Sequence, residues 1–261
     1  MKRTTRRRLT VAVLYAVLIL ALLALVLTTD WSAIKSNFFD KSVAKQLWPE
    51  LVTVAAKNTI IYTIIAFAGG LLLAILLALM KLSTVGPYRW LATGYIEFFR
   101  GLPALLVIFA FGFAVPIAFG WHPPGGLIGA GLVALIVVSS AYMAETLRAG
   151  IQAVPKGQTE AARSLGMTGG RTTVSIVLPQ AFRIVIPPLT NEFVLLIKDT
   201  SLLAIIGVAA GQRELTTYAR DMLSLTANST PLIAAAVMYL IITLPLTQLV
   251  AWLERRQQRA R

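Results

Sequence analysis

The sequence contains no cysteine and a single histidine, His122. A chain without cysteine has no disulfide, no thiol nucleophile and no thiolate metal site, and one histidine leaves no imidazole pair for zinc. The pattern G-x-x-x-x-G-K-[ST] of a phosphate-binding loop is also absent, so any ATP must bind to another chain. Only 13% of the residues are charged, where a soluble domain has about a quarter. With 57% hydrophobic residues and a mean hydropathy of +0.76, the composition excludes an ordinary soluble enzyme and indicates an integral membrane protein.

Six apolar runs are long enough to cross a membrane as helices. A bilayer core about 30 Å thick requires roughly 20 apolar residues in a helix. The third and fourth runs belong to one uncharged stretch, which the sequence H-P-P-G-G at residues 122–126 divides, because prolines and glycines together indicate a turn. The predicted spans are 9–28, 58–80, 101–120, 126–147, 184–208 and 232–253. The predicted fold class is an all-α membrane protein with about six transmembrane helices.

The first run follows a cluster of basic residues, as the apolar region of a signal peptide does. It is longer than such a region, and no A-x-A cleavage pattern follows it. We therefore interpret it as a retained anchor helix. The outer segment that follows is predicted to form a helix on the membrane surface near residues 43–55.

Basic residues outnumber acidic residues by 24 to 11, which gives a formal net charge of +13. Lys and Arg concentrate in the cytoplasmic loops of membrane proteins. With the N-terminus inside, the predicted cytoplasmic segments 1–8, 81–100, 145–183 and 254–261 hold 17 of the 24 basic residues. We therefore expect a multi-pass protein with both termini in the cytoplasm and no nucleic-acid partner.

The cytoplasmic segment between the fourth and fifth spans contains a short predicted helix. Pro155 is suited to the start of a helix and Gly166 to the left-handed position after its end. The residues between them make a helix of about ten residues, about 15 Å long. On composition alone, this helix would only connect two spans.

The spacing within this segment matches a known motif. Glu160, Ala161 and Ala162 are followed after three residues by Gly166, and after nine more by the sequence I-V-L-P at 176–179. This arrangement resembles the EAA motif, E-A-A-x(3)-G-x(9)-I-x-L-P, of permease subunits of bacterial ABC importers. Three further segments are similar to the polar amino-acid uptake permeases of the histidine/glutamine/glutamate family: E-F-F-R-G-L-P at 97–103, N-E-F at 191–193 and K-D-T-S-L at 198–202.

The resemblance runs from about residue 57 to the C-terminus and implies a type I ABC importer permease. The expected divisions are 1–57, an additional N-terminal helix and outer segment; 58–253, the transmembrane domain, with its coupling loop at about 155–179; and 254–261, a basic tail. In this family the coupling helix docks on the ATPase, so Glu160, Ala161, Ala162 and Gly166 would form that contact. The implied partners are two ATPase subunits that carry ATP and Mg, a second permease copy or a similar permease, an extracytoplasmic binding protein, and membrane lipid. This chain itself would hold no cofactor or metal, would not be an enzyme and would lie in the bacterial cytoplasmic (inner) membrane.

Polar residues in the fifth span have two interpretations. Ionisable side chains inside a membrane are costly and usually face a partner or a water-filled pathway. The first interpretation is that the span lines the translocation pathway and binds the ammonium and carboxylate of an amino acid, and the second is an internal structural network. The residues concerned are Asn191, Glu192, Lys198, Thr200 and Ser201. Pro187 and Pro188, just before them, are expected to break the helix.

Two charged pairs at a spacing of three residues, Glu97 with Arg100 and Glu145 with Arg148, are predicted to be structural ion pairs. The predicted function is translocation of a polar amino acid, of the glutamine, glutamate or basic class, by alternating access driven by ATP. One alternative is a secondary transporter driven by an ion gradient, with Glu192 or Asp199 as the coupling site. A membrane scaffold is the other alternative.

Overall fold

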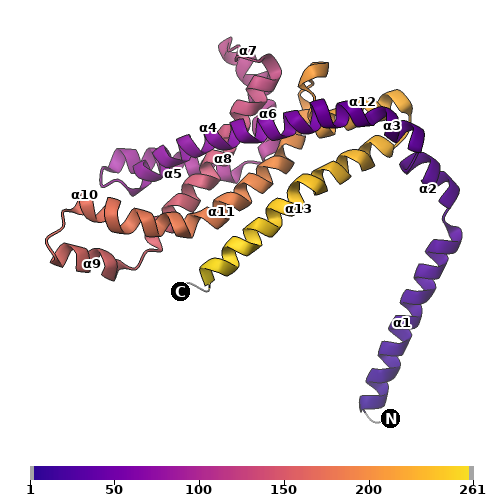
Figure 1. The fold of residues 1–261 in the computed structure, drawn as a ribbon, viewed down its shortest axis with the longest axis horizontal. Helices are drawn as coiled ribbons and strands as arrows, with labels where there is room; N and C mark the ends of the chain where they lie inside the picture. The colour runs from indigo at the N-terminus through magenta and orange to yellow at the C-terminus, as the bar shows by residue number, and fades with distance from the viewer. Residues whose placement is uncertain (1–2, 259–261) are drawn as a thin grey trace.

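The computed structural model describes residues 3–258, and this part of the chain is helical without any strand (Figure 1). The long helices are α1 (Arg3–Thr28), α4 (Lys57–Leu82), α5 (Gly86–Gly101), α8 (Gly126–Gln152), α11 (Leu178–Asp199) and α13 (Thr230–Gln258). The shorter helices are α2 (Trp31–Phe38), α3 (Lys41–Glu50), α6 (Ala104–Phe109), α7 (Val115–Phe119), α9 (Lys156–Ser164), α10 (Gly169–Thr172) and α12 (Leu215–Thr226). Single π-helical turns, η1 (Leu51–Ala56), η2 (Ala110–Ala114) and η3 (Thr173–Val177), and 3-10 turns, η4 (Thr200–Ile205) and η5 (Ala210–Gln212), complete the order. The predicted all-α class is confirmed.

The core is an elongated bundle in which α8 packs between α4 and α11, with α5 and α13 outside them (Figure 1). Close helix contacts depend on small residues of α4 and α8. A Cβ atom at Gly70 would lie 2.4 Å from Oγ of Ser139, and one at Gly131 would lie 2.5 Å from a methyl carbon of Leu203. A side chain at either position would displace these neighbours, so α8 lies close to α4 at Gly70 and to η4 at Gly131.

The segment predicted as a separate surface helix near residues 43–55 is helical, but it continues directly into the second span. The backbone runs from α3 through η1 into α4 without a break, so the expected boundary at residue 57 lies within one continuous helix (Figure 1). Its buried side, with Leu47, Leu51 and Ala55, packs against α12 and α13. The segment is therefore helical as predicted, with one face covered by the C-terminal part of the chain, and its position at a membrane surface stays a prediction.

The third predicted span, 101–120, is only half of a bent pair of helices. α5 and the unit from α6 to α7 meet at an angle of 104° across Leu102 and Pro103. The segment 81–100, predicted as a cytoplasmic loop, is largely the helix α5, whose Ala92 and Ile96 are fully buried against α4 and α8. Counting the bent pair as one crossing, residues 3–258 contain six helical units that are long and apolar enough to span a membrane.

The predicted break at Pro187 and Pro188 was wrong, because α11 is continuous through both residues. Two prolines remove two backbone donors, and α8 packs on α11 just before them. A Cβ atom at Gly150 of α8 would lie 2.0 Å from Cγ1 of Val185, so the two helices are in very close contact there.

α1 stands apart from the bundle (Figure 1). Every side chain from Thr10 to Thr28 is exposed in this chain, and the window is the most hydrophobic of the candidate spans. Such a helix fits a lipid environment or contact with another protein chain. The hairpin of α9 and α10 lies at the end of the bundle opposite to α2, α3 and α12.

Candidate functional site

The segment that resembles the coupling loop forms a short, firmly ended helix. α9 spans nine residues from Lys156 to Ser164, with Pro155 before it, as predicted. Gly166 has a φ of +84°, the left-handed conformation that favours glycine. The N–H of Gly166 donates to the carbonyl of Arg163 (3.0 Å) and that of Met167 to the carbonyl of Ala162 (3.1 Å), the paired bonds of a Schellman ending. The loop that leaves the helix therefore has a defined direction.

The four motif residues do not share one environment. Glu160 and Ala161 are exposed, whereas Ala162 is only 5% exposed, on the side of α9 that faces η3. Ala162 therefore packs against η3 of the same chain. Leu165, which was not among the predicted contact residues, is 86% exposed at the end of the helix. A large apolar side chain so exposed at the end of a polar helix suits contact with a partner.

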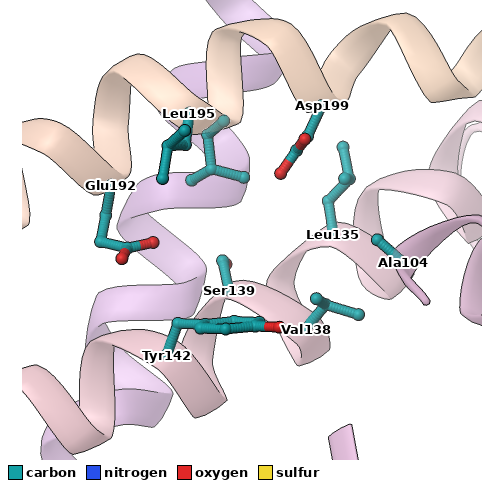
Figure 2. Close-up of a pocket in the computed structure, with 9 residues that line it drawn as sticks. Ala104, Leu135, Val138, Ser139, Tyr142, Glu192, Leu195 and Asp199 are labelled. Atoms are coloured by element: carbon teal, nitrogen blue, oxygen red, sulfur yellow. The ribbon is translucent and has the colours of Figure 1, made fainter. Parts of the chain in front are cut away.

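The second feature is a pocket of about 310 Å³ between α8, α11 and the start of α6 (Figure 2). Its wall is apolar apart from four polar side chains, those of Ser139, Tyr142, Glu192 and Asp199. The apolar lining residues are Ala104, Leu135, Val138, Leu195 and Leu196. Figure 2 shows the carboxyl groups of Glu192 and Asp199 directed from α11 towards the α8 side of the pocket, Glu192 near Tyr142 and Asp199 near Leu135 and Ala104.

Glu192 is the only one of the five predicted pathway residues that lines this pocket. Asn191 and Lys198 are exposed elsewhere on α11, and Thr200 is buried with its hydroxyl donating to the carbonyl of Ile197 (2.7 Å). Ser201 is partly buried and does not line the pocket.

Asp199 was predicted only as an alternative ion-coupling site and was not among the predicted pathway residues. It lies seven residues after Glu192, and seven residues make nearly two full turns of a helix, so both side chains lie on one face. This spacing was the signal that could have identified it.

An ion-pair network joins three helices at the end of the bundle near α9. The predicted pair of Glu145 and Arg148 is confirmed, with Nε of Arg148 3.0 Å from Oε2 of Glu145. The predicted pair of Glu97 and Arg100 was wrong. Glu97 instead lies 3.7 Å from Nζ of Lys81, which also binds Glu145 at 3.0 Å. Glu97 thus lies beside Lys81 and not beside Arg100, three residues after it in the sequence.

At the opposite end, Glu214 caps the start of α12 and is fully buried. Burial raises the pKa of its carboxyl group above the usual value, and hydrogen bonds from Thr217, Thr216 and Tyr239 act in the opposite direction. The backbone N–H groups of Thr216 and Thr217 donate to its two oxygens, each at 2.6 Å. Within residues 3–258, no group of three or more His, Asp or Glu side chains is arranged to hold a metal ion.

Comparison with known proteins identifies the family. The profile of the family described as binding-protein-dependent transport system inner membrane component matches residues 70–259. The chain belongs to this family. The probable glutamine ABC transporter permease protein GlnM of Bacillus subtilis (strain 168) is 42% identical over 208 residues, which cover 78% of this chain and 91% of GlnM. The arginine transport system permease protein ArtQ of the same organism is 37% identical over 188 residues, 72% of this chain and 83% of ArtQ.

A solved structure supports the same assignment. A chain in the structure titled "Crystal structure of an amino acid ABC transporter with histidines" is 36% identical and superposes with a TM-score of 0.75, covering 83% of this permease and 98% of that chain. The resemblance to amino-acid ABC importer permeases is therefore confirmed. This protein is a multi-pass inner-membrane permease subunit, a transport component rather than an enzyme. These findings do not favour the secondary transporter driven by an ion gradient.

Proposed function

We propose that this permease moves a polar amino acid of the glutamine, glutamate or basic class across the cytoplasmic membrane, with both chain termini in the cytoplasm. Its partners are two ATPase subunits, which bind ATP and Mg, a second permease copy or a similar permease, an extracytoplasmic binding protein, and membrane lipid. The relatives named for glutamine and arginine support the substrate class. The single observation that carries the proposal is the exposed end of α9, a short helix between the spans α8 and α11 that enclose a pocket with two carboxylates.

In this proposal, α9 transmits the closure of the ATPase dimer to the spans. Glu160, Ala161 and Leu165 contact the ATPase, because they are exposed on a helix whose ends are fixed by Pro155 and the Schellman ending at Gly166. Ala162 contributes indirectly, because its buried side chain packs α9 against η3 of the same chain. ATP-driven closure is productive only if it favours one of two arrangements of the spans over the other.

The pocket between α8 and α11 is the substrate site of the proposal, with Glu192 and Asp199 as its acidic residues. Asn191, Lys198, Thr200 and Ser201 remain proposed pathway residues in a different conformation of the transporter, since alternating access changes which side chains face the pathway. Ionisable side chains within a membrane span cost free energy, so they are usually kept for function or paired with a partner.

The coupling is tested with Glu160→Ala and Leu165→Ser in proteoliposomes that contain the permease, its ATPase and its binding protein. Substrate-stimulated ATP hydrolysis should fall by about tenfold or more in each, because a charged or apolar contact at a docking surface is lost. The matched control is Thr159→Ala, which is exposed on the same helix and lies about 100° around its axis from Glu160 and about 120° from Leu165. Unchanged stimulation in both variants, with the ATPase still bound, would contradict the proposed coupling role of α9.

A further inference from the structure

An apolar groove of about 300 Å³ lies on the surface of the bundle where α3 and η1 meet α13 (Figure 1). Its lining residues recur every three or four positions along 41–51 on one side and along 230–241 on the other, so each helix contributes one stripe of its surface. Phe39, Trp48 and Ile241 line the groove and are 59%, 62% and 57% exposed, so it opens away from the bundle.

Hydrogen bonds fix one end of the groove. The N–H of Asp40 donates to the hydroxyl of Thr230 (3.0 Å), and the N–H of Ser229 donates to the carbonyl of Asn37 (2.8 Å). Behind the groove, the fully buried Leu47 packs in the cluster that α3 shares with α12 and α13. The starts of α3 and α13 are therefore held together, and the groove between them is preformed.

The groove has the length of one lipid leaflet. Residues 230–241 cover about 16 Å along α13, and half of a hydrocarbon core about 30 Å thick is about 15 Å. α13 carries no Lys, Arg, Asp or Glu from Thr230 to Leu253, so its apolar run begins at the end of the groove that the hydrogen bonds fix. A lipid acyl chain that enters at this end can therefore follow the groove to the middle of the membrane.

The fixed end of the groove carries positive charge. Lys41 lines the groove and is exposed, and the exposed Lys45 follows one turn later, with a side chain inclined back towards the start of the helix. Neither lysine forms an ion pair with another residue of 3–258. The carboxylate of Asp40, which also lines the groove, accepts hydrogen bonds from the N–H groups of Ser42 (2.8 Å) and Val43 (3.2 Å) and so caps α3. The two lysines are left to attract an anion.

We propose that this groove binds one phospholipid with a net anionic headgroup, such as phosphatidylglycerol. One acyl chain lies between α3 and α13, and the phosphate lies beside Lys41, with the charge of Lys45 adding to the attraction. Trp48, about 10 Å further along the helix than Lys41, contacts the upper part of the acyl chain. The lipid thereby links the N-terminal part of the chain to its last span, and this role is independent of the proposed transport function.

The test uses the permease–ATPase complex in nanodiscs of phosphatidylcholine that contain an increasing fraction of phosphatidylglycerol with brominated acyl chains. Bromine quenches the fluorescence of a tryptophan that it contacts, and the difference between wild type and Trp48→Phe isolates the signal of Trp48. A parallel series contains brominated phosphatidylcholine. The variants are Lys41→Gln, alone and combined with Lys45→Gln, and Ala44→Phe, which places a ring in the groove. The matched control is Lys57→Gln, an exposed lysine further along the same continuous helix that does not line the groove.

In the wild type, half of the Trp48 quenching should occur at a fraction of phosphatidylglycerol about tenfold to thirtyfold lower than that of phosphatidylcholine, as expected for two lysines beside an anionic lipid. Lys41→Gln should reduce this preference by about fivefold, and the double variant should abolish it. Ala44→Phe should weaken quenching by both lipids, and Lys57→Gln should behave like the wild type.

Equal quenching of wild-type Trp48 by the two lipids would overturn the inference even if the variants do not assemble, because the groove would then not select an anionic headgroup. Absence of quenching by both lipids would also overturn it, since α1 or a second permease chain would then cover the groove. A preference that persists in the double lysine variant contradicts the assigned role of Lys41 and Lys45. The assay contains no transported substrate, so its failure would leave the proposed transport function unaffected.

Discussion

Lys81 of α4 and Glu145 of α8 form an ion pair 3.0 Å long at the end of the bundle nearest α9. Their side chains are 15% and 23% exposed, so the pair is largely removed from water. Arg148 binds the same carboxylate, and Glu97 of α5 approaches Lys81. The network therefore connects three helices close to the segment proposed to contact the ATPase.

Replacing Glu145 by glutamine should destabilise the permease by about 1–3 kcal/mol, because two partly buried cations lose their shared carboxylate. The melting temperature of the purified permease–ATPase complex in detergent measures this loss. Lys81→Met combined with Glu145→Gln should cost less than the sum of the single changes, since the two residues interact directly. Glu254→Gln, an exposed glutamate on α13, is the control. Additive losses would show that Lys81 and Glu145 are not energetically coupled.

The contact between α8 and α11 at Gly150 gives a second prediction. Gly150→Ala should destabilise the protein by about 1–3 kcal/mol, because the new Cβ would lie 2.0 Å from Cγ1 of Val185. Adding Val185→Ala removes that methyl group and should restore part of the loss. In Gly94→Ala on α5, the new Cβ meets nothing within 4 Å, so stability should stay equal or rise slightly. An unchanged melting temperature in Gly150→Ala would mean that the two helices are less closely packed.

Hydrophobic runs, and prolines and glycines at helix ends, predicted most of the helices. The span over 126–147 agrees with α8, and Pro155 with Gly166 defined α9 closely. These features are local, because apolar length and backbone conformation are properties of a short stretch of sequence.

The predictions that were wrong concern features that depend on contacts between segments far apart in the sequence. α11 continues through the proline pair where α8 packs closely on it at Val185. Glu97 pairs with a lysine that lies sixteen residues before it in the sequence. The 104° bend after α5 and the position of Arg100 against Tyr142 likewise depend on tertiary packing. Asp199 differs from these, because its spacing from Glu192 was readable from the sequence.

The left-handed conformation of Gly166 predicts a graded effect on coupling. An alanine at φ +84° costs about 1–2 kcal/mol, whereas asparagine tolerates this region better. Gly166→Ala should therefore alter the end of α9 and reduce substrate-stimulated ATP hydrolysis more than Gly166→Asn does. Gly169→Ala is the control, since its backbone is not left-handed and a Cβ there meets nothing within 4 Å. Equal effects of all three changes would argue against a role for this backbone conformation.

Glu214 predicts a specific dependence of stability on pH. Because burial raises the pKa of its carboxyl group in the folded protein, the folded state holds a proton more tightly than the unfolded state does. The stability from this group is fully present below its unfolded pKa of about 4.5 and is lost as pH rises through the folded pKa. Glu214→Gln should remove this contribution to the pH dependence.

Melting temperatures of wild type and Glu214→Gln, measured from pH 5 to pH 8, test this prediction. The difference between the two proteins should shift in favour of the wild type as pH falls, by about 1.4 kcal/mol in unfolding free energy for each unit by which the pKa is raised. Glu50→Gln changes an exposed glutamate on α3 and serves as the control for a general effect of charge. If the curves of wild type and Glu214→Gln run parallel across this range, Glu214 does not change its proton affinity on folding, and its role is confined to capping α12.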